Sequence, residues 1–507
     1  MSLGRAGPFW RCMLTRPLAQ ALGAVRALFL WVCITLPAGA SPWAEVGDNQ
    51  LRADLELLQA AGVVEEVTVQ WPLPWQSLAA DLSRANLAGE PASVHQAVQR
   101  LVARARAETA PGMTAWASLD ATNKPSLVYS FDSLGRGEGQ AQLALELNSG
   151  IFSGRLALGG ITQDFGGKPN KIMPDGTYLS ARLGGVRVYA GYLDHWWGPG
   201  QISALQLSNN ARPMPQIGFM RSGTQASSWP ILRWLGPWQF EFFIGKFDGP
   251  QIQSNAYYDA TRVTVHPLSG LEIGLSKTEQ ICGQGHSCVP LRDYLTNFDF
   301  STHPNNVNGE GAFDIKYSRK IGLVPFQIYA QLMNEDYSWT TSSGSTYLAG
   351  ASIFLPTAGS PMKLTMEYTD TIATKTPFDF GRNIFGYTYT DYQFPDGMHY
   401  RARTLGFSLD TDSQLLSLQA NWSDPAGRFY ELSLHHAMIG SKHAPGVSVV
   451  TNYPVIVNMA EARFSLPLTL GGRSTHLDLA GRLQDDQPRP HNGFAAALEV
   501  ALRMPLN

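Results

Sequence analysis

The 507-residue chain has few charged residues, since Asp, Glu, Lys and Arg together make up 16% of it, against roughly 25% in an ordinary soluble domain. It also lacks long apolar runs. After residue 40 no stretch approaches the roughly 18 apolar residues that a membrane-spanning helix needs, although apolar residues make up 44% of the chain. These absences argue against a helical membrane protein and are typical of a chain that shows apolar side chains to lipid on alternate residues only. A soluble β-rich enzyme remains compatible with the composition.

The features of nucleotide and nucleic-acid binding are missing as well. The glycine cluster of residues 135–139 has neither a strand–turn–helix context nor a following Lys-Ser/Thr pair. The formal net charge is −3, and it becomes −7 without the four arginines of residues 1–40, which contain no acid (−3 − 4). A mildly acidic chain argues against nucleic-acid binding, which usually needs a basic face. We expect no cofactor and no resident metal.

Residues 1–40 predict a cleaved signal peptide. Arg5, Arg11, Arg16 and Arg26 form a basic region, an apolar stretch follows at 27–36, and small residues at 38–40 or 42–44 offer a cleavage site. An uncleaved membrane anchor is the alternative, but the apolar stretch is short for a span. We therefore expect an exported protein.

Cysteine is scarce. Of the four cysteines, Cys12 and Cys33 lie in the predicted signal peptide, and Cys282 and Cys288 lie in the remainder with five residues between them. In an exported chain such a pair predicts a disulfide that closes a small loop. A zinc site would need more ligands than the neighbouring His286 supplies.

Residues 41–112 predict a small helical segment on the periplasmic side. Helices are expected at about 48–62 with Asp48 as N-cap and Gly62 as the stop, at about 76–85, and at about 93–108 with Ser93 as N-cap. Three short helices are marginally stable alone. We expect them to pack on the larger remainder of the chain.

From residue 113 to residue 507 the apolar period changes to two. Leu143, Leu145 and Leu147 alternate with Gln142, Ala144 and Glu146, and similar segments recur to the end of the chain. About 390 residues at roughly 22 per strand with its turn predict a transmembrane antiparallel β-barrel of about 18 strands, with the polar members facing a wet lumen. An antiparallel sandwich has the same period.

Two further features favour the barrel, and one does not. The connections are rich in Gly, Asn, Asp and Pro, and aromatic residues such as Tyr387, Tyr389 and Tyr392 cluster near expected strand ends, as in the aromatic girdles of such barrels. The chain does not end on the aromatic residue that is usual for outer-membrane barrels, because its last four residues are Met504, Pro505, Leu506 and Asn507.

Residues 189–248 differ from the surrounding repeats, because Trp, Pro, Gly and Asn are unusually dense there. We interpret this stretch as a structured loop between two strands. Its candidate site residues can stack on sugar rings or bond sugar hydroxyls and carboxylates: Asp194, Trp196, Trp197, Asn209, Asn210, Arg212 and Arg221. The same residues could instead form a plug inside the barrel, with Arg212 paired to Asp194. Motif density alone does not locate a ligand, so the plug is favoured here. The Cys282–Cys288 loop and residues 298–308 are then the candidates for glycan contact.

This stretch resembles the Wzi family of capsule-assembly outer-membrane proteins. The matching motifs are Asp194 followed by residues 196–200 (Trp-Trp-Gly-Pro-Gly), residues 208–213 (Ser-Asn-Asn-Ala-Arg-Pro) with Pro215, and residues 235–238 (Leu-Gly-Pro-Trp). The resemblance implies an 18-stranded barrel with a small helical bundle near its periplasmic end. It also implies a lectin-like role in holding capsular or extracellular polysaccharide at the cell surface.

The resulting hypothesis is a bacterial outer-membrane protein, not an enzyme, whose partners are the polysaccharide, outer-membrane lipid and the barrel-assembly machinery. We expect a monomer. A diffusion porin is the main alternative. An outer-membrane enzyme is the other, but no G-x-S-x-G elbow is present. The Ser433 and His435 pair, two residues apart on one strand face, is more simply a lumen-facing polar pair.

Overall fold

The structure, a computed structural model, describes residues 41–506 apart from 133, 165–171, 287, 289–306, 336–342, 358–360, 442–447, 471–472 and 488–492. The predicted signal peptide and residues 298–306 of the predicted glycan loop lie outside the described residues. Among the described helices, none combines the length and the apolar character needed to cross a membrane.

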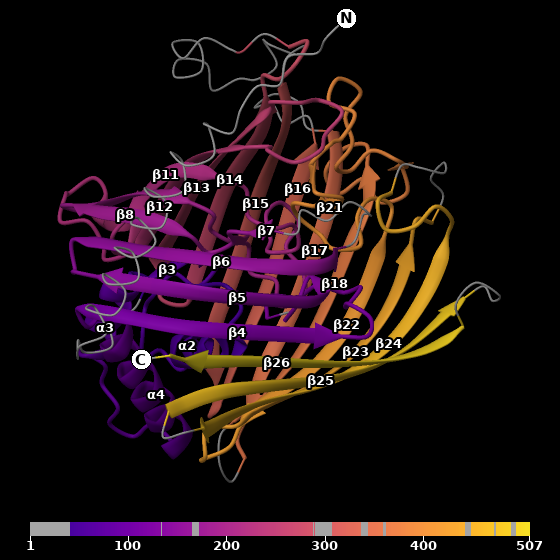
Figure 1. The fold of residues 1–507 in the computed structure, drawn as a ribbon. Helices are drawn as coiled ribbons and strands as arrows, with labels where there is room; N and C mark the ends of the chain where they lie inside the picture. The colour runs from indigo at the N-terminus through magenta and orange to yellow at the C-terminus, as the bar shows by residue number, and fades with distance from the viewer. Residues whose placement is uncertain are drawn as a thin grey trace, which may run out of the picture.

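The chain forms a closed antiparallel β-barrel, as the alternating pattern predicts (Figure 1). Twenty strands take part in the ring. Two of them, β7 (Ile172–Met173) and β19 (Asn383–Ile384), are two-residue additions, because β6 also pairs directly with β8 and β18 with β22. The ring therefore has 18 continuous strands (20 − 2), and it closes where β26 pairs with β4. These strands are β4 (Gly112–Thr122), β5 (Gly137–Asn148), β6 (Phe152–Asp164), β8 (Tyr178–Leu183), β9 (Val186–Gly191), β11 (Gln216–Arg221), β12 (Trp238–Lys246), β13 (Tyr257–Leu268), β14 (Leu271–Ile281), β15 (Val307–Ile321), β16 (Val324–Glu335), β17 (Ser343–Leu355), β18 (Met362–Thr374), β22 (Gln414–Ser423), β23 (Phe429–Ile439), β24 (Val455–Leu470), β25 (Arg473–Gln487) and β26 (Phe494–Pro505).

The two faces of the barrel wall differ as the sequence period demands. On β23, Leu432 and Leu434 are exposed on the outside, whereas Ser433 and His435 are buried on the inside. His435 pairs with Ser417 of β22 at 2.8 Å, which fits the interpretation of Ser433 and His435 as lumen-facing polar residues. A strand with one apolar and one polar face is stable here because lipid solvates the first and the barrel interior satisfies the second.

The two ends of the barrel differ in their connections. At one end, here the short-turn end, β8 and β9 are joined by residues 184–185 and β15 and β16 by residues 322–323. At the other end, the long-loop end, the connections include residues 192–215 and 375–413. Bacterial outer-membrane barrels have short periplasmic turns and longer extracellular loops.

Three helices, α2 (Asn49–Ala60), α3 (Trp75–Leu82) and α4 (Ala92–Thr109), gather at the short-turn end (Figure 1). Asp48 caps α2, and its side chain accepts from the Leu51 amide at 2.9 Å. The N-cap of α4 is Pro91, two residues before the expected Ser93, and the fixed backbone of Pro lets the helix begin there. Ten of the twelve residues of α2 are buried, polar ones included, so this helix lies against the barrel interior rather than in solvent.

In the described part of the chain, side chains occupy much of the barrel lumen. Residues 192–215, here called the inner loop, fold inward from the long-loop end, as do residues 123–136 and much of residues 375–413. Three short sheets hold these segments together: β1 (Trp43–Ala44) with β3 (Leu73–Pro74), β2 (Gln70–Trp71) with β10 (Trp196–Trp197), and β20 (His399–Tyr400) with β21 (Arg403–Thr404). In the described part of the chain, the polar strand residues therefore face an interior that is largely occupied by other protein segments.

Candidate functional site

The stretch 189–248 is not one insertion between two strands. It contains the barrel strands β9, β11 and β12, and only the inner loop, 192–215, leaves the wall and enters the lumen. Its predicted site residues share the lumen except Arg221, which ends β11 at the short-turn end. There Arg221 lies over the Trp238 ring at 3.8 Å from the centroid.

Trp196 and Trp197 are fully buried at the centre of the interior. They form β10, which pairs with Gln70 and Trp71 of the helical segment. The Trp196 indole donates to the Gly200 carbonyl at 3.0 Å, and the Trp197 ring packs against Phe243 of the wall. Neither ring offers a free face to a sugar, so here these tryptophans are packing elements.

Asn209 and Asn210 join the inner loop to the other inward segments. The Asn209 amide donates to the Phe131 carbonyl at 3.0 Å. The Asn210 amide donates to the Thr404 carbonyl at 2.9 Å and its oxygen accepts from Arg403 at 3.1 Å. Each amide satisfies a buried group that would otherwise be left unpaired.

Arg212 and Asp194 do not pair with each other, contrary to the prediction. Arg212 binds Asp175 at 2.8 Å, and Asp194 accepts instead from Arg136 at 2.8 Å. Burial raises the pKa of Asp194 to about 6, against the opposing effect of Arg136. The four charges still form one cluster, since Arg136 also lies 3.8 Å from Asp175.

A charged network that sequence reasoning missed ties α2 to the wall and to the inner loop. Glu56 of α2 accepts from Lys363 of β18 at 2.5 Å and from Arg52 at 3.1 Å. Arg52 also donates to the Pro199 and Gly200 carbonyls. Although burial favours the neutral acid, Lys363, Lys316 and Arg52 hold the pKa of Glu56 well below its usual range.

The wall supplies a second anchor for the same loop. The Glu367 carboxylate on β18 accepts from the backbone amides of Gln201, Ile202 and Ser203. The sequence carried one signal for these contacts, because Lys363 and Glu367 alternate with the apolar residues 362, 364, 366 and 368 of the same strand. The sequence did not indicate which groups these two side chains contact.

The loop 375–413 completes the interior at the long-loop end. Tyr389 and Tyr387 were predicted as interfacial girdle residues, but Tyr389 is fully buried and its hydroxyl donates to the Leu205 carbonyl of the inner loop. His399 pairs with Asp410 at 2.9 Å. Although burial opposes both charges, Asp410 raises the pKa of His399 and His399 lowers the pKa of Asp410.

The predicted cysteine loop lies on the same end. Cys282 and Cys288 form a disulfide, and His286 between them stacks on Phe394 with ring centroids 4.6 Å apart. The disulfide loop is thereby fixed to the loop 375–413. Together these segments form a packed cap over the lumen.

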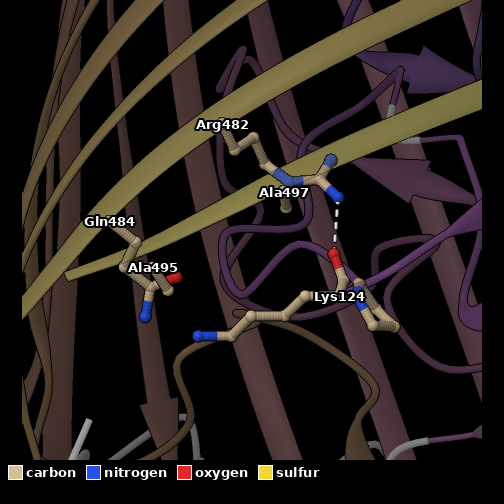
Figure 2. Close-up of a pocket in the computed structure, with 6 residues that line it drawn as sticks. Lys124, Arg482, Gln484, Ala495 and Ala497 are labelled. Atoms are coloured by element: carbon tan, nitrogen blue, oxygen red, sulfur yellow. Dashed lines mark hydrogen bonds between the residues drawn. The ribbon is translucent and has the colours of Figure 1, made fainter. Parts of the chain in front are cut away.

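A small pocket lies beside β25 and β26, where residues 124–125 meet the barrel wall (Figure 2). It has about 200 Å³ of empty space, part of it open to solvent, and is lined by Lys124, Pro125, Arg482, Gln484, Ala495 and Ala497. Arg482 donates to the Lys124 carbonyl at 2.7 Å and to Glu499 at 2.5 Å. In the described part of the chain the Lys124 ammonium has no hydrogen-bond or carboxylate partner. A free cation beside an amide and small apolar side chains can receive a carboxylate or hydroxyl group.

A family model described as capsule assembly protein Wzi matches residues 113–474, which is more than half of the chain. The chain belongs to the Wzi family of capsule assembly proteins. The matched range includes all the predicted site residues of the inner loop, together with Arg221, Cys282 and Cys288.

This Wzi-family chain is similar to a protein of Klebsiella pneumoniae in sequence and to a protein of Escherichia coli in structure. A Klebsiella pneumoniae protein, named as an uncharacterized 55.8 kDa protein in the cps region, is 27% identical over 315 residues. That match covers 60% of this chain and 60% of the relative. Wzi of Escherichia coli is described as an outer membrane protein involved in group 1 capsule assembly and as a carbohydrate-binding β-barrel. It superposes with a TM-score of 0.80 at 20% identity, over 92% of this chain and all of that chain. At this identity the likeness establishes the Wzi fold.

Proposed function

We propose that this protein is a lectin-like protein of the bacterial outer membrane that attaches exported capsular or extracellular polysaccharide to the cell surface. The Wzi family assignment supports this, as does the carbohydrate binding named for the Escherichia coli relative. In this proposal residues 1–40 are a cleaved signal peptide, 41–112 a periplasmic helical segment and 113–507 the barrel. The barrel is inserted by the barrel-assembly machinery and acts as a monomer in lipid.

The filled lumen is the observation that carries the proposal. Buried tryptophans, a charged network and three inward segments occupy the interior. The described side chains therefore leave no open path for a polymer along the barrel axis, and a diffusion porin would need one. We therefore place the contact with exported polysaccharide at the long-loop end. This end faces outward in the usual orientation of such barrels.

At the long-loop end, the Lys124 pocket is our candidate for direct sugar contact. Its unpaired ammonium favours an acidic sugar, because a charge-assisted hydrogen bond to a carboxylate is stronger than one to a neutral hydroxyl. The predicted residues of the inner loop serve a different role in this proposal: they support the cap from below.

The test is glycan retention in a strain that lacks the protein. We expect total polysaccharide to stay constant while the cell-bound fraction falls and the released fraction rises. Complementation with the native chain restores the bound fraction, and Lys124→Gln restores it only in part, whereas Lys124→Arg and the short-turn control Arg428→Gln restore it fully.

Two results would overturn parts of this account. If both fractions stay unchanged and small solutes enter the mutant cells more slowly, the protein is a porin. If the native chain restores retention and Lys124→Gln does so equally well, attachment stands but the pocket is not the contact.

A further inference from the structure

The connection between β11 and β12, residues 222–237, exposes three large apolar side chains. Trp229 is 66% exposed, Ile231 72% and Trp234 66%, all within six residues. By contrast, Trp196 and Trp197 are fully buried. Contiguous exposed apolar side chains of this size mark a surface that another apolar phase covers.

This connection is held in a defined shape at the short-turn end. The Ser222 amide donates to the Gly185 carbonyl at 2.9 Å, and the Trp238 amide donates to the Thr224 carbonyl at 2.7 Å. Gly236 has φ +65°, and a Cβ there would lie 1.9 Å from the His266 carbonyl oxygen. The Leu-Gly-Pro-Trp motif of residues 235–238 therefore fixes how the chain leaves this connection and enters β12.

The wall beside this connection has the shortest main strands. β8, β9 and β11 have six residues each, and β8 and β11 are visible on one side of the barrel in Figure 1. A strand needs roughly 9–11 residues to cross the membrane at a tilt near 45°. Six residues at about 3.3 Å each reach about 14 Å along the membrane normal, against an apolar band of about 25 Å. This part of the wall alone offers too little apolar height.

We propose that residues 222–237 are an interfacial anchor that inserts into the phospholipid leaflet at the short-turn end. Trp229, Ile231 and Trp234 extend the lipid-facing belt, which on the neighbouring strands includes Leu183 and Phe219. Trp is favoured at the membrane–water interface because its ring is apolar and its N–H finds a polar partner. Continuity with this belt is the reason to choose lipid over a protein partner.

The charge on this connection fits the same occupant. Arg233 lies between Ile231 and Trp234 in the short helix η1 (Arg233–Leu235), and in the described part of the chain no carboxylate pairs with it. A guanidinium at this depth can bond a lipid phosphate, while its aliphatic stem stays among the apolar side chains. The anchor thus matches a phospholipid in both its apolar and its charged groups.

The test places a fluorescent label on the connection and measures its depth. Ile231→Cys and Trp234→Cys are each labelled with bimane in a chain that carries Cys12→Ser and Cys33→Ser and whose Cys282 and Cys288 are oxidised. Ala426→Cys, on the exposed polar turn between β22 and β23 at the same end, is the matched control. The proteins are reconstituted in phosphatidylcholine/phosphatidylglycerol vesicles that carry a nitroxide on the headgroup or at carbon 5 of an acyl chain.

We expect the carbon-5 nitroxide to quench labels at 231 and 234 several-fold more than the label at 426, and aqueous iodide to show the reverse order. Equal iodide quenching at all three sites would show that water covers the connection and would overturn the proposal. So would efficient cross-linking between two copies through 231 or 234, because a second chain would then be the occupant. The use of two sites keeps the test decisive if one variant does not fold.

Discussion

Glu56 is the residue whose loss should damage the interior most for the smallest change in volume. Its carboxylate is completely buried and contacts Lys363 at 2.5 Å, Arg52 at 3.1 Å and Lys316 at 3.8 Å. Glu56→Gln keeps the shape and some hydrogen bonding but removes the negative charge that faces Lys363 and Arg52. Lys316 keeps its contact to Glu272 at 3.6 Å, whereas the buried charges of Lys363 and Arg52 lose the carboxylate that they contact.

Breaking a buried ion pair by removing one partner typically costs about 3–5 kcal/mol, and we expect Glu56→Gln to lower the free energy of unfolding by that amount. The helix α2 should also loosen from the wall, because Gln201 and Gln327 bond the same carboxylate. We expect the Glu56→Gln barrel to conduct ions and the native barrel not to do so, because loosening of α2 would open the lumen.

The assay is urea unfolding of the purified barrel in lipid, followed by single-channel recording in planar bilayers. Asp81→Asn is the control, since the Asp81–Arg84 pair on α3 has a largely exposed guanidinium, and surface pairs contribute about 0–1 kcal/mol. The double variant Glu56→Gln with Lys363→Gln should recover part of the loss. If Glu56→Gln and Asp81→Asn unfold within about 1 kcal/mol of each other, the argument for a stabilising network is refuted.

Three further outcomes follow from the same interior. Trp197→Ala should cost about 3–5 kcal/mol and reduce the heat-modifiable folded barrel seen on cold SDS gels; a fully folded barrel with normal stability would contradict its packing role. The His399–Asp410 pair should be at full strength in mildly acidic solution and weaken as pH rises through the raised pKa of His399 or falls through the lowered pKa of Asp410. Hydrogen exchange of the loop 375–413 measures this, and His399→Gln should remove the alkaline limb. Arg212→Lys should open the inner loop, because Lys cannot reproduce the paired contact to Asp175; limited proteolysis detects this, and an unchanged cleavage pattern would count against it.

The sequence predicted the barrel because its signal is local. Outward residues such as Leu432 and Leu434 and inward ones such as Ser433 follow one another along a single strand, so the period of two can be read without knowing any partner. The closed ring of 18 strands agrees with the number expected from chain length.

The contents of the barrel could not be predicted in the same way. Asn210 bonds Thr404, 194 residues away, and no local pattern links the two positions. Arg212 was assigned to Asp194, its nearer acid in sequence, but the structure places Asp175, which precedes β8, beside it instead. The tryptophan motif was found easily, yet composition alone could not show that both rings are buried.

The link between α2 and the inner loop gives the barrel a mechanical property. A polymer pulled by flow would strain the cap, and a cap hinged only at its strand ends would swing outward under such a load. Here the force passes inward through the inner loop to Arg52, which bonds the Pro199 and Gly200 carbonyls, and then through Glu56 and Lys363 into the opposite wall. A force on the cap is therefore distributed between the ends of its own strands and a strand on another part of the barrel wall.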